Sequence, residues 1–359
     1  MKLKAALTAT KKQHMKNLLL KSVFGTFLTT ICSLGGFSQD IHFSQFFEAP
    51  LLRNPALAGI FSGDLRFQGV YRNQWNSVTV PYQTASLNGE YKLPVGRSDD
   101  FLTLGGEILY DKAGTVALTA THVLPVINYH KSLSSEKNMY LSLGFMGGVV
   151  QRRFDRSKIT TNSQFNGTDY DPTLSDGENF ANTGYNYLDG SVGLSFNSQI
   201  GENQDDNIFI GAAYHHFNKS AKVSFYSNDK IEMIPKVVVS GGVRMGVNDF
   251  SFVTFHTDYS QQGANTEVIG GMLYSYKLDD PADPRYIFHA GAFIRWKDAL
   301  IPVAKMEFKP MAIAVSYDAN VSQLKTASQG HGGFELSISY QAFFDRDNST
   351  KNAVRCTRF

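Results

Sequence analysis

The feature that most constrains this chain is a series of segments of about ten residues in which apolar and polar side chains alternate. In residues 64–72 (DLRFQGVYR), every second side chain from Leu65 onward is Leu, Phe, Gly or Tyr. Residues 82–92, 101–111 and 334–343 repeat the pattern. A period of two places successive side chains on opposite faces, which is the geometry of a β-strand. The chain beyond residue 60 is therefore predicted to be all-β.

Extending the pattern predicts about fourteen strands, an even number as single-chain outer-membrane barrels have. Two segments depart from it, because 208–217 is apolar on both faces and Pro125 is expected to interrupt its strand. The predicted strands are 64–72, 82–92, 101–111, 115–130, 138–152, 186–198, 207–217, 234–247, 249–260, 264–277, 285–296, 299–308, 310–318 and 334–343.

Alternation alone would also fit a soluble β-sandwich. Strands of about ten residues favour a tilted crossing of a bilayer, since strands in globular sheets average about five or six. Aromatic residues gather at predicted strand ends, as the girdles of membrane barrels do, and these are Tyr71, Tyr91, Tyr110, Tyr129, Tyr140, Tyr259, Tyr274, Tyr276, Trp296 and Tyr317. Charges occupy the other face, where a wet lumen accepts them, and these are Arg66, Arg72, Glu90, Glu107, Arg285, Arg295 and Glu335. We therefore predict a transmembrane antiparallel β-barrel of about 14 strands.

Loop lengths and composition agree with this fold class. With a periplasmic N-terminus, the outside connections include the three longest, 154–185, 218–233 and 319–331, whereas tight joins at Asn248–Asp249 and Lys309 lie inside. Long loops outside and short turns inside are the asymmetry of such barrels.

The net charge excludes one class of partner. A net charge of +2 without a basic stripe gives no reason to expect nucleic acid binding.

The N-terminus has the layout of a secretory signal peptide. Lys16 and Lys21 precede an apolar run, and small residues lead to Gln39. Met15 is an alternative start, and a lipoprotein site at Cys32 is disfavoured because Ile31 is bulky. We divide the chain into a signal peptide (1–38), an N-terminal periplasmic arm or plug (39–63), an outer-membrane barrel (64–344) and a periplasmic C-terminal tail (345–359).

The first mature stretch, 39–59 (QDIHFSQFFEAPLLRNPALAG), shows no strand alternation. Its apolar residues and prolines favour docking on the barrel over a mobile leader, since unanchored termini are usually polar. The residues that we expect to dock it are Phe43, Phe46, Asn54 and Pro55.

Signals for chemistry are weak. We expect no catalytic residues, no cofactor and no metal site. The acidic residues of 154–185 could bind Ca²⁺, but their spacing is not that of an EF-hand loop. His215 and His216 are adjacent, so as strand residues they would point to opposite faces. A catalytic Ser with a base and an acid could still assemble in space, which leaves an outer-membrane lipase as one alternative.

Several sequence segments resemble the PorP/SprF family of Bacteroidota outer-membrane proteins. They are 39–59, YRNQW at 71–75, then Pro81, Thr84 and Ser86, SYDANVSQL at 316–324, Ala327–Ser328, GGFELSISY at 332–340 and the closing RCTRF. The family's tail has Pro where this chain has Thr357. The resemblance implies a barrel of the type IX secretion system in the outer membrane. Such barrels act with periplasmic ring components in secretion or surface anchoring of cargo, including gliding adhesins with a C-terminal sorting domain.

Closure of a barrel makes its first and last strands neighbours. Polar residues near the outer ends of predicted strands one, thirteen and fourteen would then meet, and we name them the seam cluster: Arg72, Gln74, Trp75, Asp318, Asn320 and Glu335. The cluster either orders the outer loops or contacts a secreted partner, or it is a structural network that holds the wall closed.

The main alternative function is a passive porin or small-solute transporter. A porin keeps an open aqueous channel, whereas a scaffold fills its lumen with side chains or with the 39–59 segment. The contents of the lumen therefore discriminate between the two functions.

Overall fold

The computed structural model describes residues 40–344, except 75–79, 97–98, 202, 204, 220–223, 227–231 and 323–330. The predicted signal peptide, the predicted C-terminal tail and Trp75 of the seam cluster lie outside the described residues. Among the described residues, no helix is both long and apolar enough to cross a membrane.

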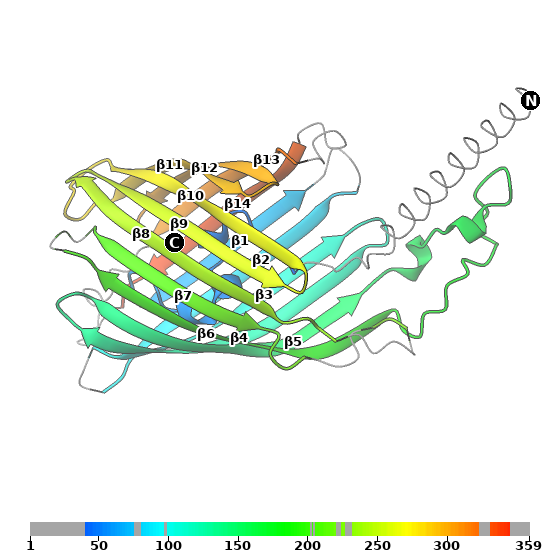
Figure 1. Ribbon diagram of the computed structural model, residues 1–359, viewed down its shortest axis with the longest axis horizontal. Coiled ribbons are helices and arrows are strands. Elements are labelled where there is room, and N and C mark those ends of the chain that lie inside the picture. Colours follow the sequence, from blue (N-terminus) through cyan, green and yellow to red (C-terminus); the bar gives the residue numbers. More distant parts are fainter. Residues whose placement is uncertain are drawn as a thin grey trace, which may run out of the picture. The chain divides into compact units, whose positions relative to one another are not determined.

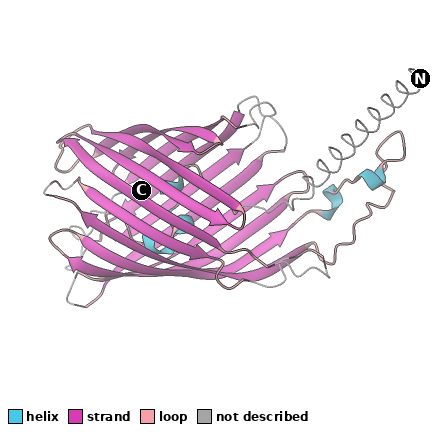
Figure 2. Cartoon of the chain, viewed as in Figure 1, coloured by secondary structure: helices cyan, strands magenta, loops and turns pink. Residues whose placement is uncertain are grey.

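Fourteen antiparallel strands close into one barrel (Figures 1 and 2), which confirms the predicted fold class. Each strand pairs with its sequence neighbours, and the first also pairs with the last, so the sheet has no open edge. The strands are β1 (Leu65–Gln74), β2 (Tyr82–Pro94), β3 (Phe101–Ala113), β4 (Leu118–Ser134), β5 (Met139–Arg153), β6 (Gly184–Gln199), β7 (Asn207–His215), β8 (Lys236–Asn248), β9 (Ser251–Gln262), β10 (Asn265–Lys277), β11 (Tyr286–Arg295), β12 (Ala299–Phe308), β13 (Met311–Asn320) and β14 (His331–Ala342).

The two faces of the wall differ as the alternation predicts. Outward positions such as Phe67 and Ile108 are about half exposed in the isolated chain, which is the band that lipid covers. Inward positions such as Glu90 and Glu107 are buried in the lumen. Two expectations were wrong. Tyr140 faces the lumen and is only 1% exposed, and Arg285 is exposed because it precedes the start of β11.

Pro125 does not interrupt its strand, contrary to expectation. It lies within β4, opposite Gly106 of β3, with its ring on the outward face. The two histidines also depart from expectation, since both are buried. β7 ends at His215, and a φ of +60° at His216 turns that side chain back inward.

The connections are longer at one end of the barrel. That end carries 154–183 and 216–235, whereas the opposite end carries the two-residue joins 249–250 and 309–310. We name the first the outer end and the second the inner end, because outer-membrane barrels have long extracellular loops and short periplasmic turns.

Candidate functional site

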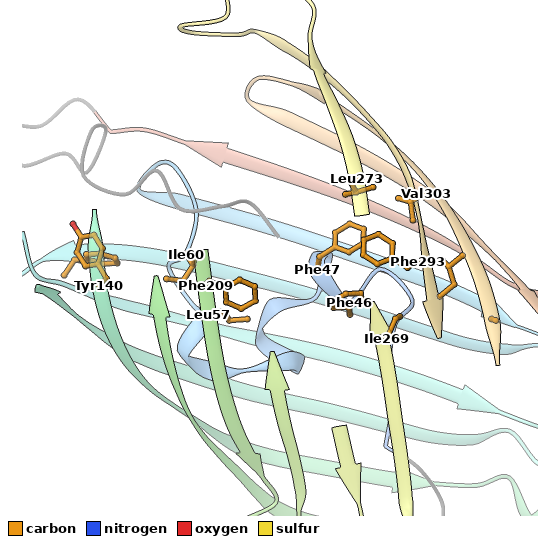
Figure 3. Packing of buried hydrophobic residues seen from close by; sticks show 13 residues of the cluster. Phe46, Phe47, Leu57, Ile60, Tyr140, Phe209, Ile269, Leu273, Phe293 and Val303 are labelled. Atoms are coloured by element: carbon orange, nitrogen blue, oxygen red, sulfur yellow. The ribbon is translucent and has the colours of Figure 1, made fainter. Parts of the chain in front are cut away.

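Residues 40–63 lie inside the barrel, and we name them the lumen arm (Figures 2 and 3). The arm forms a 3₁₀ turn at Phe46–Glu48, the single-turn helix α2 (Pro50–Arg53) and a second 3₁₀ turn at Pro55–Leu57. Proline begins both later turns, where its missing N–H costs nothing. Asn54 caps the last turn by accepting a hydrogen bond from Ala56 N at 2.8 Å. Local sequence thus folds the arm into turns that cannot join the sheet.

The arm runs the length of the lumen. Asp40 N donates to Gln262 Oε1 at 2.9 Å, and the Asp40 carboxylate is 3.3 Å from Lys236 Nζ and 3.4 Å from His216 Nε2. These partners stand at the outer end of β7, β8 and β9. At the inner end, Asp64 N donates to Ala342 O at 2.8 Å. The arm therefore crosses from the outer to the inner end before β1 begins.

An apolar cluster joins the middle of the arm to the wall (Figure 3). The Phe47 ring stacks on Phe293 at 5.1 Å and on His256 at 5.9 Å, and Phe46 meets Phe293 edge-on at 5.4 Å. Aromatic pairs of this kind contribute about 0.5–1.5 kcal/mol beyond the area they bury. The cluster consists of Phe46, Phe47, Leu57, Ile60, Phe101, Tyr140, Phe209, Ile269, Leu273, Phe293, Ala299, Ile301 and Val303.

Charges on the arm meet opposite charges on the wall. Arg53 Nε donates to Asp258 Oδ1 at 2.8 Å, and the Arg53 guanidinium also lies 5.0 Å from the centre of the Phe209 ring. Glu48 accepts hydrogen bonds from Gln68 and Lys305. Both arm residues and their three polar partners on the wall are buried. Each arm charge is thus compensated where it is buried, as a low-dielectric site requires.

Members of the predicted seam cluster meet where the barrel closes. Arg72 and Glu335 are register partners across the β1–β14 pair, and Arg72 Nε is 3.3 Å from Glu335 Oε1. Arg72 Nη2 is 3.1 Å from Asp318 Oδ2. With its amide oxygen toward Arg72, Gln74 accepts from Arg72 Nε at 3.1 Å. Asn320 is buried at the end of β13, opposite Ala299 of β12.

The arm completes the seam cluster from the lumen side. Ser44 N and Gln45 N each donate to a carboxylate oxygen of Glu335 at 2.7 Å. Ser44 Oγ donates to Asp318 Oδ2 at 2.7 Å, and Arg72 Nη1 donates to His42 O at 2.7 Å. The cluster therefore holds the arm as well as joining the strands.

Two members of this network were missed from the sequence. Arg295 Nη2 lies 3.0 Å from Asp318 Oδ2, so Asp318 bridges two guanidinium groups. Ser44 supplies the hydroxyl between arm and wall. The alternation does place Arg295 among the inward charges, and its position at the outer end of β11 is the signal that could have added it to the cluster. Ser44 carried no signal, because it belongs to no periodic segment.

The predicted arm residues are all buried. Asn54 Nδ2 donates to Leu194 O at 3.0 Å, so its amide also binds the wall. Glycines opposite the arm allow this approach: a Cβ at Gly193 would lie 1.9 Å from Asn54 Oδ1, and one at Gly144 would lie 2.5 Å from the Pro55 carbonyl carbon. Phe43 packs near the outer end with Ala49, Val70 and Leu109.

A cavity of about 1020 Å³ opens at the inner end, lined by β8 to β14 and their inner turns, by Asn203 and Asp205 between β6 and β7, and by Ser62 of the arm. Its lining carries both signs of charge, including Arg244, Lys277, Asp205 and Glu307. Lys305 and Phe293 bind the arm. On β12 and β11 they lie nearer the outer end of the barrel than Glu307 and His289 do. These contacts of the arm therefore lie between the cavity and the outer end of the barrel.

One constellation has the residue types of a hydrolase triad. Ser275 Oγ lies 2.7 Å from His289 Nδ1, and His289 Nε2 lies 3.5 Å from Glu307 Oε1. Ser275 is 0% exposed, however, so its hydroxyl cannot reach a substrate in this conformation. We therefore interpret the contacts of Ser275, His289 and Glu307 as a hydrogen-bonded network of the barrel wall.

The acidic residues of the long outer loop have other partners. Asp176 pairs with Arg156 at 2.9 Å, and Glu178 accepts from the Tyr226 hydroxyl at 2.8 Å. Asp171 accepts hydrogen bonds from the backbone and hydroxyl of Thr173. Among the described residues, no group of three or more His, Cys, Asp or Glu could hold a metal ion.

Comparison with solved structures finds membrane barrels. The toluene transporter TbuX of Ralstonia pickettii has a TM-score of 0.50 at 11% identity, over 83% of this chain and 94% of that one. A Pseudomonas aeruginosa FadL homologue has a TM-score of 0.46 at 11% identity, over 82% and 94% of the two chains. At such identities the likeness to TbuX shows the fold alone. A search of curated proteins gives no match.

Comparison with protein families gives the identity. The family described as "Type IX secretion system membrane protein PorP/SprF" matches residues 35–340, which is most of the chain and includes the arm, β1 to β13 and all but the last two residues of β14. This is not a known enzyme family. The chain therefore belongs to the PorP/SprF family of type IX secretion system membrane proteins, and it has the fold of an outer-membrane barrel.

Proposed function

We propose that this protein is a non-enzymatic barrel that supports type IX secretion, surface anchoring of cargo proteins, or both. The cargo in this proposal includes adhesins with a C-terminal sorting domain. The protein is exported by its N-terminal signal peptide to the outer membrane of a Bacteroidota cell, where it works with periplasmic ring components. Family membership supports the secretion role.

The observation that carries the proposal is that the lumen arm runs along the lumen from the outer to the inner end. The arm is fixed at the outer end through Asp40, in the middle through Arg53 and at the inner end through Asp64. A porin needs a continuous aqueous path, whereas a scaffold does not. A lumen occupied along its length favours a scaffold over a passive porin.

The seam cluster fits the scaffold role in the same proposal. Glu335 and Asp318 tie the arm to the strands that close the barrel. Both carboxylates are also buried among these partners, which supports assigning the cluster to holding the wall and arm together. Cargo and ring proteins then contact the loops and the inner rim.

The test has two measurements on the tagged protein. Affinity purification from outer membranes, followed by mass spectrometry, is expected to recover periplasmic ring components or a large secreted protein. In planar bilayers the wild-type protein is expected to stay closed. The matched control replaces residues 41–60 with a Gly/Ser segment of equal length, and it is expected to conduct steadily.

A wild-type barrel that purifies alone and conducts ions steadily would overturn the proposal in favour of the porin. A closed barrel that purifies alone would support the plug but contradict the secretion role. The two measurements therefore separate the state of the lumen from the choice of partner.

A further inference from the structure

The outward face of the described strands is almost free of charge. By the alternation of exposure along each strand, three charged side chains point outward, and all three are cations: Lys112, Lys131 and Arg153. A charge on the lipid face is costly near the bilayer midplane and tolerated near the interfaces. Lys112 and Arg153 stand at the outer ends of β3 and β5, and Lys131 stands near the inner end of β4.

The two outer cations belong to one row of the sheet. Lys112 is the register partner of Thr119 on β4, and Thr119 is the register partner of Arg153 on β5. Strands are spaced about 4.8 Å apart, so the two Cα atoms are roughly 10 Å apart across Thr119. Long side chains from these positions can approach one group between them.

Below the cations, the outward side chains become first polar and then apolar, as the headgroup, interface and hydrocarbon levels of a lipid leaflet do. The next row inward is Tyr110, Thr121, Gln151 and Asn186, which are polar or amphipathic. The row after that is Ile108, Val123, Val149 and Leu188, which are 52%, 50%, 47% and 65% exposed. Successive rows on one face are about 6.8 Å apart along a strand. Hydrocarbon, interface and headgroup levels therefore follow one another up these four strands.

No carboxylate neutralises the two cations within the described residues. Asp111 is the adjacent acid, but its side chain points to the lumen and accepts from Thr84 Oγ1 at 2.7 Å. Asp155 lies beyond β5 and pairs with Lys158 at 3.3 Å. Gly184, beside Arg153 on β6, leaves room for the arginine side chain, since a Cβ there would lie 2.9 Å from Arg153 Cγ.

We propose that Lys112 and Arg153 form a binding site for the phosphate of a lipid in the outer leaflet. The guanidinium donates paired hydrogen bonds to phosphate oxygens, and the ammonium adds a point charge. The acyl chains lie against the apolar row. The same two cations could take free phosphate, but only a lipid also uses the polar and apolar rows. This site is separate from the arm and does not depend on the secretion role.

Native mass spectrometry of the detergent-purified protein tests the site, with bisphosphorylated lipid A as the probe. The wild type is expected to retain the lipid. The Lys112→Gln, Arg153→Gln double variant is expected to lose about thirty-fold in affinity, from roughly fivefold per cation near an anionic surface. Lys131→Gln is the matched control, because it removes the third outward cation at the opposite rim, and it is expected to bind as the wild type does. A shift in electrophoretic mobility between unheated and heated samples confirms that each variant is folded.

Dephosphorylated lipid A and millimolar inorganic phosphate distinguish the source of the anion. Loss of binding on dephosphorylation, without displacement by inorganic phosphate, supports a lipid headgroup site. Displacement of lipid A by inorganic phosphate would overturn the assignment to a lipid. Equal affinity of the wild type and the double variant, or an equal loss in Lys131→Gln, would overturn the site itself.

Discussion

Arg53 of the lumen arm and Asp258 of β9 form a buried ion pair although 205 residues separate them in the chain. The pair lies beside Phe209, whose ring faces the guanidinium at 5.0 Å. Neither charge would be stable there without the other. The arm and the wall therefore specify each other at this point.

Replacing one member of this pair is expected to destabilise the protein strongly. Arg53→Met leaves the Asp258 carboxylate buried without its cation, which costs about 3–5 kcal/mol. The double variant Arg53→Met, Asp258→Leu removes both charges and is expected to regain most of that loss. The measurement is the urea midpoint of the protein in lipid vesicles, followed by heat-modified gel mobility. A double variant as unstable as Arg53→Met would contradict the coupling.

Gly193 on β6 is expected to tolerate no side chain. A Cβ there would lie 1.9 Å from Asn54 Oδ1, so Gly193→Ala must displace the capping residue of the arm. Overpacking of this kind costs about 1–3 kcal/mol. Gly69→Ala is the control, because its Cβ would meet nothing closer than 3.7 Å. The urea midpoint of Gly193→Ala should be lower than that of Gly69→Ala. Equal midpoints would show that the arm can shift away from a Cβ at residue 193 at little cost.

The outer end of the arm is expected to be accessible from outside the cell. His42 has a side chain that is 30% exposed and 3.7 Å from Glu267 near the outer end of β10. In a Cys356→Ser background, His42→Cys should react with a membrane-impermeant maleimide on intact cells. Val95→Cys, in the turn at the inner end, should react only after the outer membrane is opened. Labelling in the reverse order would show that the barrel has the opposite orientation.

Alkaline pH is expected to loosen the outer end of the arm. Burial alone lowers the pKa of His216, but hydrogen bonds and charge interactions with Asp189 and Asp40 outweigh it and raise the pKa to about 9. Because the folded pKa exceeds the unfolded value of about 6.5, this contribution is complete below about pH 6.5 and is lost as pH rises through about 9.

A spin label at His42→Cys measures that loosening. Its mobility should increase between pH 7 and pH 10 in the presence of His216. In a His216→Gln background the label should be mobile already at pH 7 and change little with pH. The same pH profile in both backgrounds would exclude His216 as the titrating group.

The strands were predictable because a lipid-facing wall enforces alternation at nearly every position. β1 shows this plainly, because its buried residues Arg66, Gln68 and Arg72 are polar, whereas its exposed residues Phe67 and Tyr71 are aromatic. The ends of the strands were less predictable. For example, β4 continues to Ser134, whereas the pattern predicted that this strand ends near residue 130. Strand ends depend on pairing and turns, which hydrophobic alternation does not report.

The site was only partly predictable. Arg72, Asp318 and Glu335 could be placed together because closure of a barrel makes its end strands adjacent. The path of the arm could not be derived, since turns carry no period that fixes their direction. Its partners, such as Asp258 for Arg53, also lie far away in sequence. Composition indicated that the segment docks, but not that it spans the lumen.

The two ends of the arm are held at opposite ends of the barrel, by Asp40 and by Asp64. A segment threaded in this way is topologically enclosed once β1 and β14 have paired. The sheet must then wrap around the arm, with β14 as the last strand to be synthesised. Glu335 on that strand receives the backbone N–H groups of Ser44 and Gln45. The arm, which is synthesised first, therefore gains these hydrogen bonds only when the last strand pairs. Closure of the barrel is thus coupled to correct placement of the arm in the lumen.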